Sequence, residues 1–309
     1  AGFFAITALL ELPWAWVRTF RVEQAHGFNR MTLGLWLADG LKSATVGAAI
    51  GLPFAALLLW LMEAAGSLWW AWSWAAWLSL SLLTLLLYPT LIAPLFNRFE
   101  PLADAALRQR IETLMARCGF RSRGLFVMDG SKRSAHANAY FTGFGPAKRV
   151  VFFDTLLQRL APSEIDAVLA HELGHFSRRH LPKRLFLMGS ISLLGFALLG
   201  ELSGQLWFYS GLGVRPNLVA PSSALALLLF INVAPLASFF LTPLLSQLSR
   251  RQEFEADAYA CAHADGQDLA SALVKLYQDN ASTLTPDPLY ARFYYSHPPA
   301  AERLERLPA

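Results

Sequence analysis

Long apolar stretches alternate with charged ones along this chain. A helix needs about 20 mostly apolar residues to cross the hydrocarbon core of a membrane. Five stretches approach that length, at residues 2–17, 44–62, 68–87, 185–208 and 224–245. Glu11 interrupts the first of them, and Pro53 lies within the second. Buried core helices are the alternative, but five such stretches in one chain favour a polytopic helical membrane protein.

The basic residues predict which segments face the cytoplasm, where Lys and Arg are in excess. Arg18, Arg21, Arg30 and Lys42 follow the first apolar stretch, whereas the turn after the second contains no Lys or Arg. We therefore expect four regions: three membrane segments with a cytoplasmic loop at 18–43 (1–96), a cytoplasmic region (97–184), a membrane hairpin (185–245) and a second cytoplasmic region (246–309).

The region 97–184 has the pattern of a mixed α/β unit. Helical spacing covers 105–117, and 124–128 is typical of a strand. Residues 138–144 and 149–153 predict a β-hairpin with a turn at 145–148. Ser163 and Asp166 have the spacing of a capping box, which predicts a helix from about 162 to 179. The region from 248 onward is expected to be helical, with a loop near 286–288.

Composition supports a membrane protein and excludes several classes. Of the 309 residues, 55% are apolar and 16% are charged, whereas a soluble domain carries about 25% charged residues. The net charge is +4 without a long run of Lys and Arg, so we expect a lipid bilayer and no nucleic acid as partner. Cys118 and Cys261 belong to no CxxC pattern, which excludes a disulfide framework and a zinc knuckle.

Two histidines one helical turn apart carry the clearest chemical signal. His171 and His175 flank Glu172 in the sequence HELGH, and residues four apart share a helix face. In the HExxH motif the two His bind Zn²⁺ and the Glu is the general base; the alternative is a solvated helix with incidental histidines. The expected fold is mainly α: a polytopic α-helical membrane protein with a zincin-like α/β catalytic region that contains a small β-hairpin sheet.

A catalytic zinc site takes three protein ligands and keeps one position open. The metzincin pattern would place its third His at position 181, which is Leu181 here, and His180 is too close to His175 to reach the same ion from one helix. Glu253 could ligate the metal, because it follows the fifth apolar stretch on the same side of the membrane. Asp257, one turn later, could accept the second ring N–H of a ligand His, and Glu255 should point elsewhere. Ordinary charges on a cytoplasmic helix are the alternative.

Motifs over nearly the whole chain resemble, in order, the type I CAAX prenyl endopeptidase family, which is related to HtpX. They are HGFNRMT (26–32), SKRS (131–134), NAYFTG (138–143), RVVFFDTLL (149–157), HELGH (171–175), SRRQEFEADA (249–258) and YSHPPAAERL (295–304). The resemblance implies an integral membrane zinc metalloprotease whose helices enclose a chamber around one Zn²⁺ ion.

The resemblance also implies roles for individual residues. The zinc ligands would be His171, His175 and Glu253, and Glu172 would activate the water. Asp257 would support a ligand or donate a proton, and we favour support on geometry. The remaining implied residues stabilise the oxyanion and order the site (His297 and Arg303) or form the edge strand that binds the peptide by main-chain hydrogen bonds (Asn138, Ala139, Tyr140 and Phe141).

Expectations about the missing helices and the substrate follow from the same resemblance, and composition bears on the host. The family has seven membrane helices and the first segment here aligns with the third, so we expect the first two to be absent from this chain. The substrate would be a peptide or protein, prenylated in the CAAX reaction. A quality-control protease like HtpX, with no prenyl requirement, is the alternative. Frequent Arg, Ala and Leu favour a bacterial inner membrane over the endoplasmic reticulum membrane of a eukaryote.

A protein of another class is the remaining alternative. Glu11 and Glu201 lie within apolar segments, and ionisable residues in a membrane are costly and often functional. They could mark the conduction path of a transporter, or belong to a metal-dependent scaffold without catalytic activity. That hypothesis treats the HExxH motif and the carboxylates at 253 and 257 as coincidence.

Overall fold

Helices dominate the computed structural model, which describes residues 2–142, 147–216, 222–280, 283 and 285–307. Four helical stretches of this described part are long and apolar enough to cross a membrane: α2 (Leu33–Ala64), the stretch Gly66–Phe96, α8 (His180–Leu202) and α10 (Ser223–His263). The second stretch is built from η2 (Gly66–Leu68), α3 (Trp69–Leu87), η3 (Tyr88–Ile92) and α4 (Ala93–Phe96). Large apolar side chains on these helices, such as Trp60, Phe186 and Phe240, are exposed. Such a surface is unfavourable in water, so it faces lipid.

The first predicted segment is helical. It forms α1 (Gly2–Val17), which has 16 residues. It is followed directly by the π-helical turn η1 (Arg18–Glu23). Four of the five predicted membrane segments coincide with helices of the described residues that are long and apolar enough to span a membrane. For the first segment, spanning stays a prediction.

Several predicted boundaries also differ. The segment expected as a loop at 18–43 is largely helical, because η1 lies within it and α2 begins there at Leu33. The predicted fourth segment is divided into α8 and the short α9 (Leu206–Gly211). Helix α10 continues through the predicted boundary at 245 as one helix of 41 residues. It therefore connects the membrane part directly to the C-terminal region.

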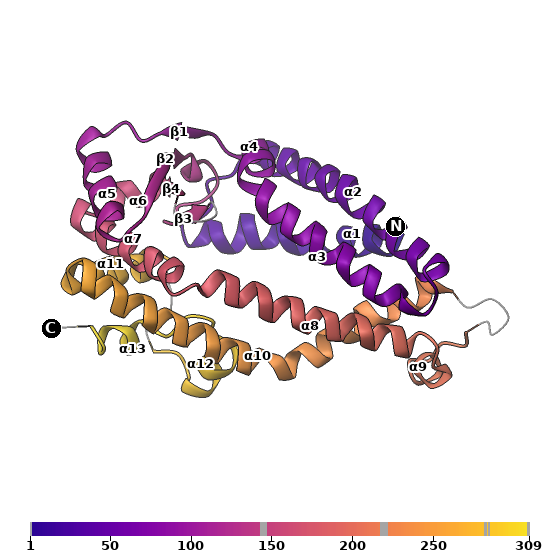
Figure 1. The fold of residues 1–309 in the computed structure, drawn as a ribbon. Helices are drawn as coiled ribbons and strands as arrows, with labels where there is room; N and C mark the ends of the chain where they lie inside the picture. Colours follow the sequence, from indigo (N-terminus) through magenta and orange to yellow (C-terminus); the bar gives the residue numbers. More distant parts are fainter. Residues whose placement is uncertain (1, 143–146, 217–221, 281–282, 284, 308–309) are drawn as a thin grey trace.

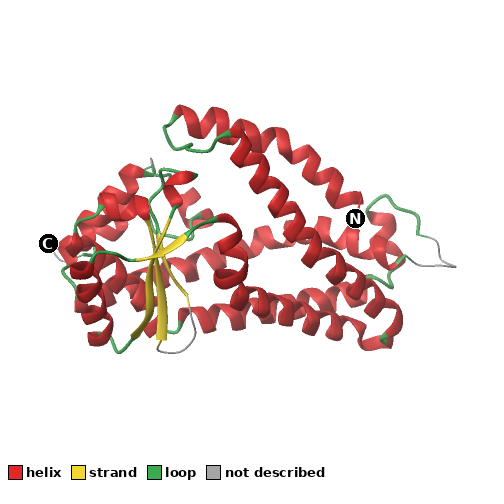
Figure 2. Ribbon diagram, turned by 90° about the horizontal axis from the view of Figure 1, so that it is seen from above, coloured by secondary structure: helices red, strands yellow, loops and turns green. Residues whose placement is uncertain are grey.

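A small sheet lies at one end of the molecule (Figures 1 and 2). Its strands are β1 (Phe99–Pro101), β2 (Arg121–Met128), β3 (Ala139–Thr142) and β4 (Ala147–Phe153), in the order β1-β2-β4-β3. Strands β3 and β4 pair antiparallel, which confirms the predicted hairpin, while β2 and β4 are parallel. Positions 143 and 144 of the predicted first strand and positions 145 and 146 of the predicted turn lie outside the described residues. Because β3 is an outer strand, its free edge is available to another chain.

Helices pack around the sheet to form the core of this end. They are α5 (Ala105–Arg117), α6 (Asp154–Arg159), α7 (Pro162–Ser177) and α11 (Gly266–Asp279), with η4 (Gly130–Lys132), α12 (Pro288–Tyr294) and α13 (Ala300–Leu304) beside them. The buried cluster includes Ile111 of α5, Val150 of β4, Leu169 of α7 and Leu273 of α11. Helix α7 is thus held by apolar contacts from three sides, which gives its HExxH face a fixed direction.

The start of α7 differs from the predicted capping box. The Ala161 N–H donates to the Glu164 carboxylate at 2.7 Å, and Pro162 occupies the first turn. Ser163 instead donates to Asp268 of α11, and Asp166 accepts from Arg110 of α5. Both residues of the predicted box therefore bind neighbouring helices, because Pro162 occupies the first helical position and the N-cap is Ala161, two residues before Ser163.

Candidate active site

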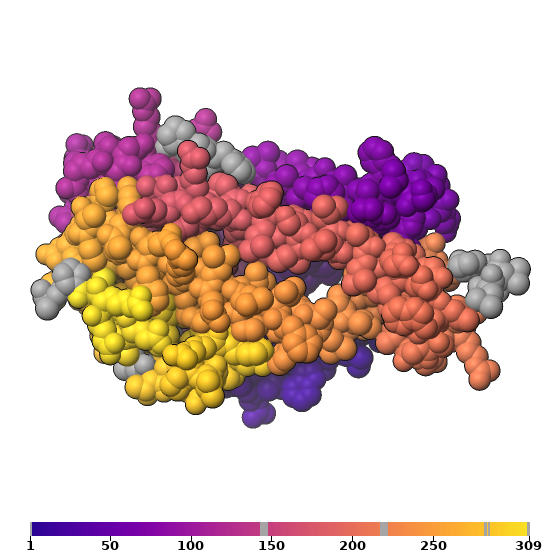
Figure 3. All heavy atoms as spheres, turned by 60° about the horizontal axis from the view of Figure 1, so that its bottom comes forward, coloured from indigo at the N-terminus to yellow at the C-terminus, as the bar shows by residue number. Residues whose placement is uncertain are grey.

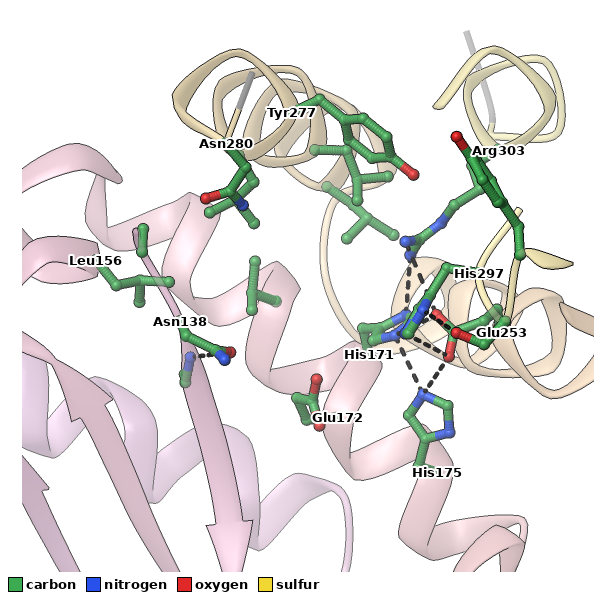
Figure 4. A pocket seen from close by; sticks show the side chains of 18 of the residues that line it. Asn138, Leu156, His171, Glu172, His175, Glu253, Tyr277, Asn280, His297 and Arg303 are labelled. Carbon is green, nitrogen blue, oxygen red and sulfur yellow. Dashed lines mark hydrogen bonds and ion pairs between the residues drawn. The ribbon is translucent and has the colours of Figure 1, made fainter. Parts of the chain in front are cut away.

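Three side chains from α7 and α10 meet at one point. Helix α7 contributes His171 and His175, whose Nε2 atoms are 3.2 Å apart, and α10 contributes Glu253. Its carboxylate oxygens lie 3.5 Å from the Nε2 atom of each histidine. Figure 4 shows the three side chains pointing toward one another. The structure thus brings together the two histidines and the distant carboxylate that the sequence indicated as a ligand set.

The spacing of these donor atoms fits a tetrahedral metal site. With metal–ligand bonds of about 2.0–2.1 Å, two ligand atoms of a tetrahedral zinc lie about 3.3 Å apart. The observed separations are 3.2, 3.5 and 3.5 Å. Imidazole and carboxylate are ligands that zinc accepts. His171, His175 and Glu253 are also the only group of three or more His, Cys, Asp or Glu residues with this proximity in the described part of the chain.

Asp257 and Arg303 hold the first histidine in place. The Nδ1 atom of His171 lies 2.8 Å from Oδ1 of Asp257, one turn after Glu253 on α10. Arg303 of α13 donates its Nε–H to Oδ2 of Asp257 at 2.9 Å, and its Nη1 lies 3.8 Å from Glu253. An Asp that accepts the Nδ1–H leaves Nε2 as the ligating atom. Asp257 is therefore placed to support a ligand.

A second hydrogen-bonded chain fixes the other histidine. The Nδ1 atoms of His175 and His180 are 2.9 Å apart, and Nε2 of His180 lies 3.0 Å from Glu255. The arrangement sets both tautomers: His180 donates to Glu255 and accepts from the Nδ1–H of His175, which leaves Nε2 of His175 free for a metal. The sequence argument excluded His180 as a ligand, but it missed this supporting contact.

The backbone between the two helices explains how His180 reaches its partner. Helix α7 ends at Ser177, earlier than predicted, and Arg179 adopts a left-handed conformation with φ of 57°. This residue redirects the chain into α8, so that His180 comes back toward His175. A non-glycine residue in this conformation is uncommon, and no residue pattern around position 179 indicates the change in direction.

Close packing of α7 on α10 sets the distance between the ligands. Gly174, inside the HELGH sequence, faces α10, where an added Cβ would lie 3.0 Å from the Cα of Ala256 and from the Cβ of Tyr259. Both contacts are tighter than a normal carbon–carbon contact. The absence of a side chain at 174 therefore allows α10 to approach closely enough for Glu253 to meet the histidines.

The environment shifts the pKa values of the motif residues in different directions. Burial disfavours a charge on His171, but hydrogen bonds to Asp257 and Glu253 outweigh it and raise the pKa from 6.5 to about 9. Burial and the neighbouring His171 lower the pKa of His175 to about 4. Because a bound metal requires both rings unprotonated at Nε2, binding would release the proton from His171. Burial raises the pKa of Glu172, which suits a group that accepts a proton near neutral pH.

The site opens into a cavity of about 900 Å³. Glu172 lines it, in the space between Asn138 and the two histidines (Figure 4). Asn138 and Ala139 line the same cavity, whereas Tyr140 and Phe141 are not among its described lining residues. The rings of Tyr140 and Phe141 pack on Phe153 and Phe176 instead.

On the other side of the ligands, His297 enters the cavity from the segment between α12 and α13. Its side chain is 63% exposed and its Nε2 atom lies 3.5 Å from Glu253. The Arg303 side chain is only 7% exposed and binds Asp257. The sequence analysis gave His297 and Arg303 the same role, but they occupy different positions. His297 faces the space available to a substrate, and Arg303 lies behind the ligands.

Two further residues line the cavity that sequence reasoning did not single out. Tyr277 of α11 donates its hydroxyl to the carbonyl of Pro298, which ties the segment next to His297 to α11. Asn280 follows α11 and contacts His136 through its Oδ1 atom at 2.7 Å. Neither residue belongs to a recognisable motif, so only the tertiary structure identifies them.

Comparison with known proteins agrees with a membrane-embedded metalloprotease. Residues 101–309 match the model of peptidase family M48, and residues 1–98 match "CAAX prenyl protease N-terminal, five membrane helices". The chain therefore belongs to peptidase family M48, as a multi-pass membrane protein. The expectation that the first two membrane helices of the family are absent is not supported by these matches.

Similar proteins come from plants, animals and fungi. The CAAX prenyl protease 1 homolog of Arabidopsis thaliana is 37% identical, over 99% of this chain and 72% of that protein. The homolog of Homo sapiens is 34% identical, over 97% and 71% of the two chains. The crystal structure of S. mikatae Ste24p matches with a TM-score of 0.91 and 35% identity, over 98% of this chain and 73% of that one. The described fold is thus that of a solved family member.

Proposed function

We propose that this chain is a zinc endopeptidase that hydrolyses a peptide bond with a metal-activated water. The observation that carries the proposal is the convergence of Nε2 of His171, Nε2 of His175 and the Glu253 carboxylate at tetrahedral spacing. Zinc held there would polarise a carbonyl and lower the pKa of a bound water. Family M48 is a peptidase family, which favours this activity over a transporter or a scaffold.

The other residues at the cavity have separate roles in catalysis and substrate binding. Glu172 accepts the proton of the attacking water and delivers it to the leaving amine. His297 donates a hydrogen bond to the oxyanion that forms on the scissile carbonyl, where a fixed donor is most effective. Arg303 and Asp257 keep the His171 ring oriented. The substrate lies as an added strand against the edge of β3 next to Asn138 and Ala139.

A prenylated C-terminal peptide is the proposed substrate class. Relatives from Arabidopsis, human and Saccharomyces cerevisiae at 34–37% identity are CAAX prenyl proteases by name. We further propose that residues 97–184 and 246–309 lie on the cytoplasmic side, where such peptides occur. The support for this orientation is the distribution of Lys and Arg.

The test compares two peptides that differ only in a farnesyl group on the cysteine. A prenyl protease should cleave the farnesylated peptide with at least about tenfold higher kcat/KM, equivalent to about 1.4 kcal/mol. Equal values would contradict a prenyl requirement and favour quality-control proteolysis. If neither peptide is cleaved by zinc-loaded protein but an unstructured membrane-protein fragment is, the peptidase assignment remains and the substrate class is wrong.

A supporting role for His180 gives a separate prediction. His180→Phe removes the acceptor for the Nδ1–H of His175 and should weaken zinc binding about 10–100-fold, the usual cost of losing a partner of a ligand His. His180→Asn, which offers an acceptor oxygen, should restore part of that affinity. Competition with a chromogenic chelator measures both. Unchanged affinity in the Phe variant would show that the ring of His175 is held by packing alone.

A further inference from the structure

A basic groove lies on a different face of α10 from the metal ligands. We define the basic groove as the hollow of about 800 Å³ whose charged lining residues are Arg178, Lys183, Arg250, Arg251, Glu255 and Arg306. Helices α8, α10 and the residues after α13 meet around it, on the side of the molecule that Figure 3 brings forward. Five cations thus face one carboxylate in the groove.

Most of this positive charge is not neutralised within the protein. Arg250 donates to the carbonyls of Ala291 and Tyr295 and therefore has a structural role. Arg251 lies 3.4 Å from Glu255, but the same carboxylate also accepts from His180. Glu255, the one carboxylate among the lining residues of the groove, is therefore already engaged by Arg251 and His180.

The other three cations have no carboxylate within ion-pair distance in the described part of the chain: Arg178, Lys183 and Arg306. The Arg306 guanidinium stacks on the ring of Phe254 at 3.7 Å, a contact that leaves its N–H groups available. Exposed cations gathered in this way attract an anion and can bind its oxygens. The groove is thus suited to a phosphate or similar group.

Apolar stripes of two membrane helices end at the groove. On α8, Lys183 is followed at helical spacing by Phe186, Leu194 and Leu198, which are 79%, 71% and 51% exposed. On α10, Arg251 is preceded at helical spacing by Leu244 at 63% exposure and Phe240 at 74%. Lys183 and Arg251 both line the groove. The groove therefore lies where α8 and α10 leave the hydrocarbon core.

We propose that the basic groove binds the headgroup of an anionic phospholipid, whose acyl chains lie along these stripes of α8 and α10. The phosphodiester satisfies the cations and the acyl chains cover the exposed apolar side chains. A soluble phosphate satisfies only the first requirement, and a zwitterionic phospholipid only the second. Basic pockets at the ends of membrane helices bind anionic headgroups for this reason.

The test uses the full chain in uncharged detergent, titrated separately with dioleoyl phosphatidylglycerol, dioleoyl phosphatidylcholine and inorganic phosphate. Native mass spectrometry measures the bound lipid. Phosphatidylglycerol should bind more tightly than phosphatidylcholine, and Lys183→Gln/Arg251→Gln should weaken it about 30-fold. The matched control is Arg121→Gln/Arg123→Gln, the same change of charge at two exposed residues of β2 outside the groove. This control should bind within about twofold of the unaltered protein.

Three results would overturn the proposal. Equal affinity for the two lipids would remove the role of the headgroup charge. Equal losses in the groove and control variants would assign the effect to overall charge. Displacement of phosphatidylglycerol by low-millimolar inorganic phosphate would show that the groove holds a phosphate from water and that the apolar stripes contribute nothing.

Discussion

Glu172→Gln is expected to abolish peptide cleavage while leaving metal binding intact. Glu172 lines the cavity beside the ligands, but its side chain is not one of the three that converge on the metal position. The amide has nearly the same shape as the carboxylate and cannot accept the proton of the attacking water. The turnover rate should fall by at least about 10³-fold, within the range assigned to general-base catalysis.

Two measurements on the same preparation separate chemistry from binding. Zinc content by mass spectrometry should match that of the unaltered protein, and cleavage of the farnesylated peptide should be lost. Retention of near-normal cleavage together with full zinc would show that another group accepts the proton. Loss of zinc would instead give Glu172 a role in holding the metal, contrary to its position in Figure 4.

Glu253→Gln should produce the opposite pattern, a loss of the metal itself. The carboxylate lies 3.5 Å from Nε2 of both histidines, and a neutral amide is a much poorer zinc ligand. Removing a supporting residue costs about 10–100-fold in metal affinity, so removing this ligand should cost more than about 100-fold. Peptide cleavage should fall with zinc occupancy and recover in part at high zinc concentration.

The matched control lies two residues away on the same helix. Glu255→Gln makes the same chemical change, but its side chain points toward His180 and still offers an acceptor oxygen. It should keep zinc affinity within a few-fold of normal. If both variants bind zinc equally well, the metal centre does not include Glu253 and the proposed site is wrong. Circular dichroism should show unchanged helix content in each.

The physical basis of both predictions is the close contact of α7 with α10. A bulkier residue at Gly174 would meet Ala256 and Tyr259, and the ligands would separate. Arg303 and Asp257 form a buried salt bridge near the site. Such a bridge adds little net stability, but it holds one geometry, because removal of one partner leaves an uncompensated buried charge. The site therefore consists of α7 and α10 in close contact, with Arg303 of α13 bound to the carboxylates of α10.

Local patterns in the sequence were sufficient to predict many of the helices and strands and which site residues share a helix face. Hydrophobic length predicted five membrane segments, four of which coincide with helices long and apolar enough to span a membrane. Alternation predicted the β3–β4 hairpin, and helical spacing predicted α5 with its observed limits. The spacing of His171 and His175 placed both on one face of α7, since the period of a helix is a property of the backbone alone. Glu253 and Asp257 were paired for the same reason. That Glu253 and Asp257 lie close to α7 was expected from the membrane topology and from the family resemblance.

Relations between distant elements required the tertiary structure. Three features depend on how separate helices pack: the turn at Arg179, the contact of His180 with His175, and the different positions of His297 and Arg303. Helical period determines which side chains share a face, but it does not determine what the face meets. That is decided by packing at sites such as Gly174, where the size of one side chain sets the distance between two helices.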